Sequence, residues 1–342
     1  MGLGKTQCAA ALPPQHSSSS VVFAMSKTAD AAALVAELGA FAGVRVKRDE
    51  PLSRYTSMKI GGPADYFIEV ESSPALSAVL PLLRRFGLAV YLLGNGSNVL
   101  VSDRGVRGAV VRLGAEFKRI AWDEQGSLVR VTVGAAYSVT QLARQAARRG
   151  YGGLEFAEGI PGSVGGAVAM NAGAYGSEFE RIVDRVEAVN AAGEPIGFSR
   201  ADMNFSYRDS HLPEGTVVTR VILRLERAEA AAVGSKLREL VGKRKSSQPS
   251  GFPNSGSMFR NPPGDFAGRL IEAAGLKGRR IGQAQIAERH ANFIVNLGGA
   301  KADEVRQLME LARREVRQRF GIELVSEVKL VGEWEGTELI TK

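Results

Sequence analysis

Residues that build disulfides and metal sites are scarce in this chain. Its 342 residues include one cysteine, Cys8, so neither an internal disulfide nor a cysteine metal cage can form. The three histidines, His16, His211 and His290, are too few and too widely spaced for a histidine metal site. No apolar run approaches the roughly 20 residues that span a bilayer. These absences predict a protein without a metal site or a membrane span, in a reducing compartment such as the cytosol.

The chain has a net positive charge. Lysine and arginine number 44 against 36 aspartates and glutamates, which gives a net charge of +8. Such an excess suits nucleic acids or phosphorylated small molecules. No helix-turn-helix, zinc or RNP pattern accompanies it, and the arginines are scattered along the chain. The sequence therefore favours a phosphorylated small ligand and predicts no nucleic-acid partner.

The first 25 residues differ from the rest. Pro13-Pro14 and the serine run Ser17–Ser20 break any helix or strand. Gly2-Leu-Gly-Lys-Thr6 imitates the end of a P-loop, but no strand can precede it, and the match to a myristoylation signal is equally loose. We expect a disordered tail, or a start codon placed upstream of a true start at Met25.

Periodicity and turn residues predict a mixed α+β fold. Helices are expected over residues 28–38, 74–86, 139–149, 266–274 and 302–320, with a helical connection at 228–232 and a basic loop at 243–250. Strands are expected over 66–70, 90–93, 109–113, 128–133, 183–190, 217–225, 292–296 and 324–331. The pattern predicts structural units at 26–115, 116–228 and 229–335.

Two glycine-rich segments are the most informative features. The segment from Gly159 to Gly176 holds six glycines in 18 residues and no lysine or arginine, and Gly94–Asn98 follows a short apolar strand. Turns of this kind can aim several backbone N–H groups at one anion, so together they suggest a long ligand with a central diphosphate. The alternative is a pair of ordinary glycine loops. A Rossmann turn is absent, because Val99 stands where the third glycine is needed and a strand follows.

Further motifs stand in a fixed order around these turns. They are Thr56-Ser-Met-Lys-Ile-Gly-Gly62, Leu93-Gly-Asn-Gly-Ser-Asn-Val-Leu100, Gly159-Ile-Pro-Gly-Ser-Val-Gly-Gly166, Asn171-Ala-Gly-Ala-Tyr-Gly176, Phe205-Ser-Tyr-Arg-Asp-Ser210, Gly256-Ser-Met-Phe-Arg-Asn-Pro262 and Ser326-Glu-Val-Lys329. In this order the chain resembles the UDP-N-acetylenolpyruvoylglucosamine reductase (MurB) family. The resemblance covers residues 45 to 332.

The resemblance implies a two-part FAD-binding fold of the vanillyl-alcohol-oxidase (PCMH) type, followed by a C-terminal α+β substrate domain. It implies that hydride passes from NADPH through non-covalent FAD to the enolpyruvyl β-carbon of UDP-N-acetyl-enolpyruvoylglucosamine. The product is UDP-N-acetylmuramate, a cytoplasmic peptidoglycan precursor. The short segment between Arg208 and Val217 matches the subclass without a tyrosine-loop insertion. The oligomeric state stays open between a monomer and a weak dimer.

The resemblance also assigns catalytic roles. Arg208 would stabilise the charge that develops on the enolpyruvyl carboxylate, since a guanidinium can bind a carboxylate with two hydrogen bonds. Ser257 would donate a proton to the α-carbon, and Glu327, expected in the last strand, would assist. Residue types alone favour a different interpretation, with Arg208 as a structural partner of Asp209 and Ser257 as a turn residue. Glu288 is a rival acid without a motif match.

Binding residues follow from the same motifs. The diphosphate of FAD is expected on Gly94, Asn95, Gly96, Ser97, Asn98, Ile160, Pro161, Gly162, Ser163, Gly165 and Gly166, with Ile60, Gly61 and Gly62 near the adenine. Substrate contacts are expected from Tyr207, Asn261 and His290, and from one basic residue within Lys243-Arg-Lys245. The competing function is an FAD-linked oxidase or dehydrogenase of the same fold that acts on another small substrate.

Overall fold

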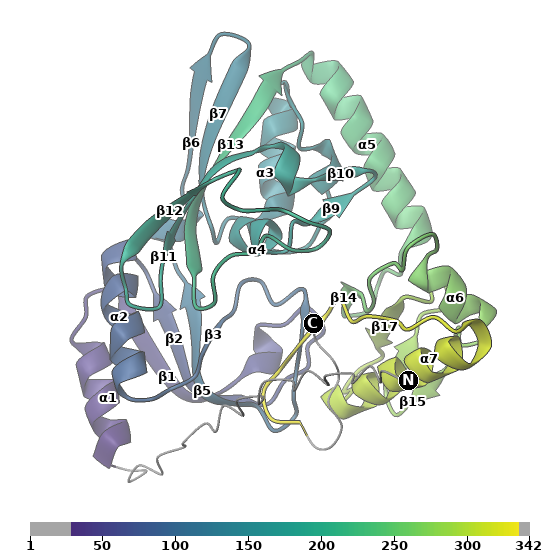
Figure 1. The fold of residues 1–342 in the computed structure, drawn as a ribbon, viewed down its shortest axis with the longest axis horizontal. Coiled ribbons are helices and arrows are strands. Elements are labelled where there is room, and N and C mark those ends of the chain that lie inside the picture. Colours follow the sequence, from purple (N-terminus) through teal and green to yellow (C-terminus); the bar gives the residue numbers. More distant parts are fainter. Residues whose placement is uncertain (1–28, 335–342) are drawn as a thin grey trace, which may run out of the picture.

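The computed structural model describes residues 29–334, which form three larger sheets and two two-stranded pairs, with helices packed around them (Figure 1). The expectation for residues 1–25 therefore lies outside the described residues. Within the described range, no helix combines the length and the apolar character needed to cross a membrane.

The first sheet has the strand order β1-β2-β5-β3. Its strands are β1 (Val44–Pro51), β2 (Pro63–Val70), β3 (Val90–Leu92) and β5 (Val106–Leu113), and helices α1 (Ala29–Gly39) and α2 (Ser73–Arg85) belong to the same unit. Helix α2 starts where the sequence predicts, because the hydroxyl of Ser72 accepts from the N–H of Ala75 and Pro74 lies in the first turn.

The second sheet is antiparallel and has the order β12-β11-β13-β7-β6. Its strands are β6 (Ile120–Gln125), β7 (Leu128–Gly134), β11 (Val183–Val189), β12 (Pro195–Ser199) and β13 (Val217–Arg227), with β8 (Tyr151–Gly152) paired to β13. The glycine-rich ribbon contains the short helix α4 (Val164–Ala169) and the hairpin β9 (Gly173–Ala174) and β10 (Ser177–Glu178). The first two sheets share one hydrophobic core, which joins Ile68 and Val70 to Val131 and Val221.

Helix α5 (Ala230–Ser247) leads from the second sheet to the third unit (Figure 1). The expected basic loop at 243–250 is wrong for most of its length, because leucine, arginine, lysine and glutamate are good helix formers and carry the helix to Ser247. The third sheet has the order β14-β17-β16-β15. Its elements are β14 (Asn254–Ser257), α6 (Ala267–Ala273), β15 (Arg280–Ile281), β16 (Ala284–Ile286), β17 (Phe293–Asn296) and α7 (Ala302–Phe320).

The last strand returns to the first unit. Strand β18 (Lys329–Val331) pairs in parallel with β4 (Val99–Val101), directly after the Gly94–Asn98 turn. The predicted strand 324–331 is therefore shorter than expected, and Glu327 precedes it. The reason is a contact with the third unit: Ser326 bridges to Phe259, and the N–H of Glu327 donates to the carbonyl of Met258 at 2.8 Å.

A side chain of the first unit also begins a helix of the third. The carboxylate of Asp103 accepts from the N–H groups of Ala302 at 2.9 Å and Asp303 at 3.1 Å. These donors have no intrahelical acceptor at the start of α7, and a negative charge is favourable there. Asp103 therefore fixes the position of α7 relative to the first unit.

Candidate active site

A cavity of about 620 Å³ lies where the three units meet. Its wall combines the end of β3 and the Gly94–Asn98 turn, the glycine-rich ribbon, the end of α5 and the serine loop Ser255–Ser257. Arg208, Ser257 and Glu327, which the sequence places far apart, all line it. So do the predicted flavin residues Gly94, Asn95, Gly96, Ser97, Asn98, Ile160, Pro161, Gly162, Ser163, Gly165 and Gly166.

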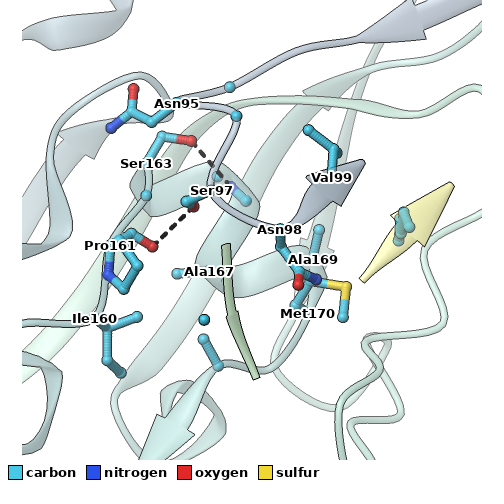
Figure 2. A pocket seen from close by; sticks show the side chains of 18 of the residues that line it. Asn95, Ser97, Asn98, Val99, Ile160, Pro161, Ser163, Ala167, Ala169 and Met170 are labelled. Carbon is cyan, nitrogen blue, oxygen red and sulfur yellow. Dashed lines mark hydrogen bonds between the residues drawn. The ribbon is translucent and has the colours of Figure 1, made fainter. Parts of the chain in front are cut away.

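The two glycine turns touch each other at this cavity (Figure 2). The hydroxyl of Ser97 donates to the carbonyl of Pro161 at 3.0 Å. Gly162 has a φ of +132°, and a Cβ there would lie 3.0 Å from the Ser97 hydroxyl. A Cβ on Gly94 would lie 2.7 Å from the Ser163 hydroxyl. Glycine is needed at both positions because each turn packs directly against the other.

Backbone donors at the turns suit an anionic group. Across residues 29–334, no acceptor is found for the N–H groups of Asn95, Gly96, Ser97 and Asn98. Ser163 caps α4 by accepting from the N–H of Gly166 at 3.4 Å. Free N–H groups beside a cavity of this size fit the diphosphate at the centre of a dinucleotide such as FAD.

Arg208 and Glu327 form an ion pair across the cavity wall. Nε of Arg208 donates to Oε1 of Glu327 at 3.1 Å, and its Nη2 donates to the carbonyl of Gly173 at 3.2 Å. Both side chains are largely buried, with exposed fractions of 17% and 19%. Arg208 also has a φ of +62°, which is uncommon for a residue with a side chain. Two hydrogen bonds therefore hold a strained residue in one orientation.

The pKa of Glu327 lies above its ordinary value. Burial raises it by disfavouring the charged carboxylate, while the nearby guanidinium groups of Arg208 and Arg260 act in the opposite direction. The first effect is the larger, so Glu327 holds its proton more tightly than a solvated glutamate does. Its backbone carbonyl accepts from the Asn98 amide at 3.1 Å, which ties the segment before β18 to the first glycine turn.

Ser257 reaches the cavity from the end of β14, opposite Phe293 of β17. The loop before it is held by the first unit, because the Ser57 hydroxyl donates to the carbonyl of Asn254 at 2.7 Å. Within the described residues, the hydroxyl of Ser257 has no hydrogen-bond partner. It therefore stays available to a bound molecule.

The structure does not bring Ile60, Gly61 and Gly62 to the cavity. Ile60 is buried in the core of the third unit with Met58. The segment packs against the chain near Asp103, and Gly62 donates its N–H to the carbonyl of Ser102 at 2.9 Å. This motif therefore holds the first and third units together, and its expected place near the adenine stays a prediction.

Tyr207, Asn261 and His290 also lie outside the cavity lining. Tyr207 is exposed and carries the Arg208 guanidinium over its ring at 4.8 Å. The amide oxygen of Asn261 accepts from the N–H of Ala267 at the start of α6, at 3.1 Å. Burial lowers the pKa of His290, whose Nδ1 accepts from the N–H of Asn292 at 3.3 Å. In this structure the last two have structural partners.

Arg244 is a cavity residue that sequence reasoning left unresolved. Of Lys243, Arg244 and Lys245, only Arg244 lines the cavity, while Lys243 pairs with Glu239 at 2.6 Å on the outer face of α5. Burial lowers the pKa of Arg244, and no carboxylate within the described residues forms an ion pair with it. The helical spacing from the buried Leu240 would have selected Arg244, had the helix been predicted to this point.

Comparison with known proteins agrees with this geometry. Residues 64–199 match the FAD binding domain family, and residues 248–331 match the C-terminal domain of UDP-N-acetylenolpyruvoylglucosamine reductase. The UDP-N-acetylenolpyruvoylglucosamine reductase 2 of Symbiobacterium thermophilum is 50% identical over 290 residues, which cover 84% of this chain and 92% of that protein. The enzyme of Heliobacterium modesticaldum is 46% identical over 288 residues, covering 84% and 90%.

A solved structure is similar over the same range. The crystal structure of UDP-N-acetylenolpyruvylglucosamine reductase (MurB) from Thermus caldophilus has a TM-score of 0.73 at 39% identity, covering 84% of this chain and 99% of that one. The fold and the family matches define a flavoprotein in which an FAD binding domain precedes a C-terminal domain, as the sequence predicts. The chain belongs to the UDP-N-acetylenolpyruvoylglucosamine reductase family.

Proposed function

We infer that this protein uses NADPH to reduce UDP-N-acetyl-enolpyruvoylglucosamine to UDP-N-acetylmuramate. The observation that carries the proposal is the meeting of Arg208, Ser257 and Glu327 on one cavity beside the two glycine turns. Bound FAD supplies the hydride chemistry, which none of these side chains could perform. The chain's own task is to bind, orient and protonate the substrate.

Arg208 stabilises the negative charge that develops on the substrate carboxylate after hydride arrives. Its Nε is taken by Glu327 and one Nη2 hydrogen bond by Gly173, which fixes the plane of the guanidinium toward the cavity. A preoriented donor of this kind needs no reorganisation when charge develops. Glu327 supports that orientation and, because its pKa is raised, can also hold a proton close to the site.

Ser257 donates the proton to the α-carbon. Its hydroxyl lines the cavity and is not engaged by another described residue. A hydroxyl is a weak acid, but an enolate is a strong base, and a positioned donor transfers only one proton per turnover. Glu327, on the same wall, is placed to help restore that proton.

Arg244 binds an anionic group of the ligand, and we propose the diphosphate of the UDP moiety. Its guanidinium is desolvated at the cavity edge and forms no ion pair with a described carboxylate, so a phosphate would supply a direct ionic partner. Of Lys243, Arg244 and Lys245, Arg244 is thus the residue that we propose to contact the substrate. We further propose that the reaction takes place in the cytoplasm, on a monomer or weak dimer.

The direct test is NADPH oxidation by the purified protein. We expect rapid turnover with UDP-N-acetyl-enolpyruvoylglucosamine, slow turnover without it, and product heavier than substrate by two hydrogens in mass spectrometry. An FAD-linked oxidase of the same fold would instead consume oxygen at a rate independent of this substrate. That result would overturn the proposed function and leave the flavin site intact.

A further inference from the structure

Helix α3 (Val139–Arg148) holds the flavin loop Glu158–Gly162 from behind. The N–H of Val139 donates to the carbonyl of Gly162 at 3.2 Å, and the Thr140 hydroxyl donates to the carbonyl of Ile160 at 3.3 Å. One turn further along α3, Arg144 reaches the Glu158 side chain. Residues four apart share one helix face, so Thr140 and Arg144 contact the loop along a single line.

The third contact is an ion pair whose two side chains differ in burial and whose hydrogen bonds all go to one carboxylate oxygen. Oε1 of Glu158 accepts from both Nε of Arg144 at 3.0 Å and Nη2 at 2.7 Å. The Glu158 side chain is 2% exposed, whereas Arg144 is 56% exposed. Oε2 of Glu158 is buried and has no hydrogen-bond partner within residues 29–334. Arg144 therefore supplies every hydrogen bond that this buried carboxylate receives.

Glu158 lies next to the part of the loop that faces the cavity. Gly159 follows it directly, and a Cβ on Gly159 would lie 2.7 Å from Cδ of Arg244. Ile160, Pro161 and Gly162 then line the cavity, with Pro161 bonded to Ser97. A shift of the Glu158 carboxylate would move this loop against both neighbours.

We propose that Glu158, held by Arg144, is a positioning residue that fixes the flavin loop, so that this ion pair sets the affinity for FAD. Removing Arg144 alone would deprive the buried carboxylate of its ion-pair partner and of every hydrogen bond it receives, which costs more than removing both charges together. The pair should therefore show strong energetic coupling. The inference depends on FAD binding and not on the identity of the substrate.

The test compares Arg144→Met, Glu158→Gln and the double variant, with Arg148→Met as the control. Arg148 is exposed one turn further along the same helix. The dissociation constant for FAD is measured by titrating apo-protein and following the quenching of flavin fluorescence. The melting temperature of the apo-protein is recorded in parallel. We expect Arg144→Met to weaken FAD binding roughly 10- to 100-fold and Glu158→Gln only a few-fold.

The double variant shows whether the two residues act on FAD affinity as a coupled pair. We expect it to bind FAD more tightly than Arg144→Met does, because no unpaired charge remains. If the losses simply add, or if only the apo-protein melting temperature falls while FAD affinity is kept, the proposal is wrong. Should Arg144→Met fail to fold, Arg144→Lys replaces it: because lysine keeps the charge but loses the fork, its FAD affinity should fall below native. If Arg144→Lys and Glu158→Gln both bind FAD as tightly as the native protein does, the proposal is wrong.

Discussion

Nε of Arg208 lies 3.1 Å from Oε1 of Glu327, although 119 residues separate them in the sequence. Arg208 belongs to the segment after the glycine-rich ribbon, and Glu327 to the segment before β18. The contact therefore links the second unit to the chain that returns to the first. In the proposed mechanism, charge stabilisation and proton supply meet in this pair, so we expect a change at either residue to alter both.

The first prediction concerns Arg208→Lys. Lysine keeps the positive charge but cannot bond Glu327, Gly173 and a carboxylate from one rigid plane. We expect kcat to fall by about 10²–10³ while the substrate dissociation constant changes much less. Steady-state kinetics with varied substrate separates the two, with Arg200→Lys on the exposed surface as the control. Loss of affinity alone would make Arg208 a binding residue.

The second prediction separates two half-reactions at Ser257. Ser257→Ala should bind FAD normally and accept hydride from NADPH at close to the native rate, because proton donation comes later. Reoxidation by the UDP-enolpyruvyl substrate should slow by roughly 10²–10⁴. Stopped-flow flavin absorbance follows both steps, and Ser246→Ala on exposed α5 serves as the control. Equal slowing of both steps would indicate a disturbed flavin pocket. If neither step slows, Ser257 is only a turn residue.

The third prediction uses the raised pKa of Glu327. The folded protein holds this proton more tightly than the unfolded chain does, so the resulting stabilisation is complete below the ordinary value of 4.5 and is lost as pH rises through the folded-state pKa. Glu327→Gln does not titrate. We expect the melting temperature of the variant, relative to native, to increase with pH over this window. A difference that stays constant with pH would contradict the raised pKa of Glu327.

The fourth prediction is that FAD is held without a covalent bond. No histidine or cysteine from the described part of the chain lines the cavity, and these are common attachment residues. Acid precipitation should therefore release all of the yellow colour into the supernatant. Colour that stays with the washed pellet would show a covalent link and redirect attention to another cavity residue.

The fifth prediction concerns the cap of α7. Asp103→Ala removes the acceptor for the N–H groups of Ala302 and Asp303, and we expect the free energy of unfolding to fall by about 1 kcal/mol. Asp103→Asn keeps one oxygen acceptor and should lose less. Urea denaturation of all three proteins measures the difference. If alanine and native unfold at the same urea concentration, the cap contributes nothing to stability.

Local signals in the sequence were sufficient for much of the fold. Ser72 and Pro74 mark the start of α2, and the free N–H groups of the Gly94–Asn98 turn follow from glycine spacing. Short-range hydrogen bonds decide such features, so a short window of sequence contains them. Arg244 was ambiguous only because the extent of α5 was underestimated.

Long-range contacts could not be read in this way. The motif from Thr56 to Gly62 is an example, because the carbonyl of Met58 accepts from the Asn296 amide at 2.9 Å, across 238 residues. A sequence motif marks candidate functional residues, but it does not show which residues they contact in the fold. The shortened last strand has the same origin, since pairing with β4 begins only at Lys329.

Pairing of β18 with β4 also sets the order of events during biosynthesis. At about 5–20 residues per second, a ribosome that has completed β4 needs roughly ten seconds to a minute to reach β18. During that interval the Val99–Val101 edge lacks its strand partner, and the neighbouring Asn98 amide lacks the carbonyl of Glu327. Enclosure of the cofactor is therefore a late step, reached only after residue 331 has left the ribosome.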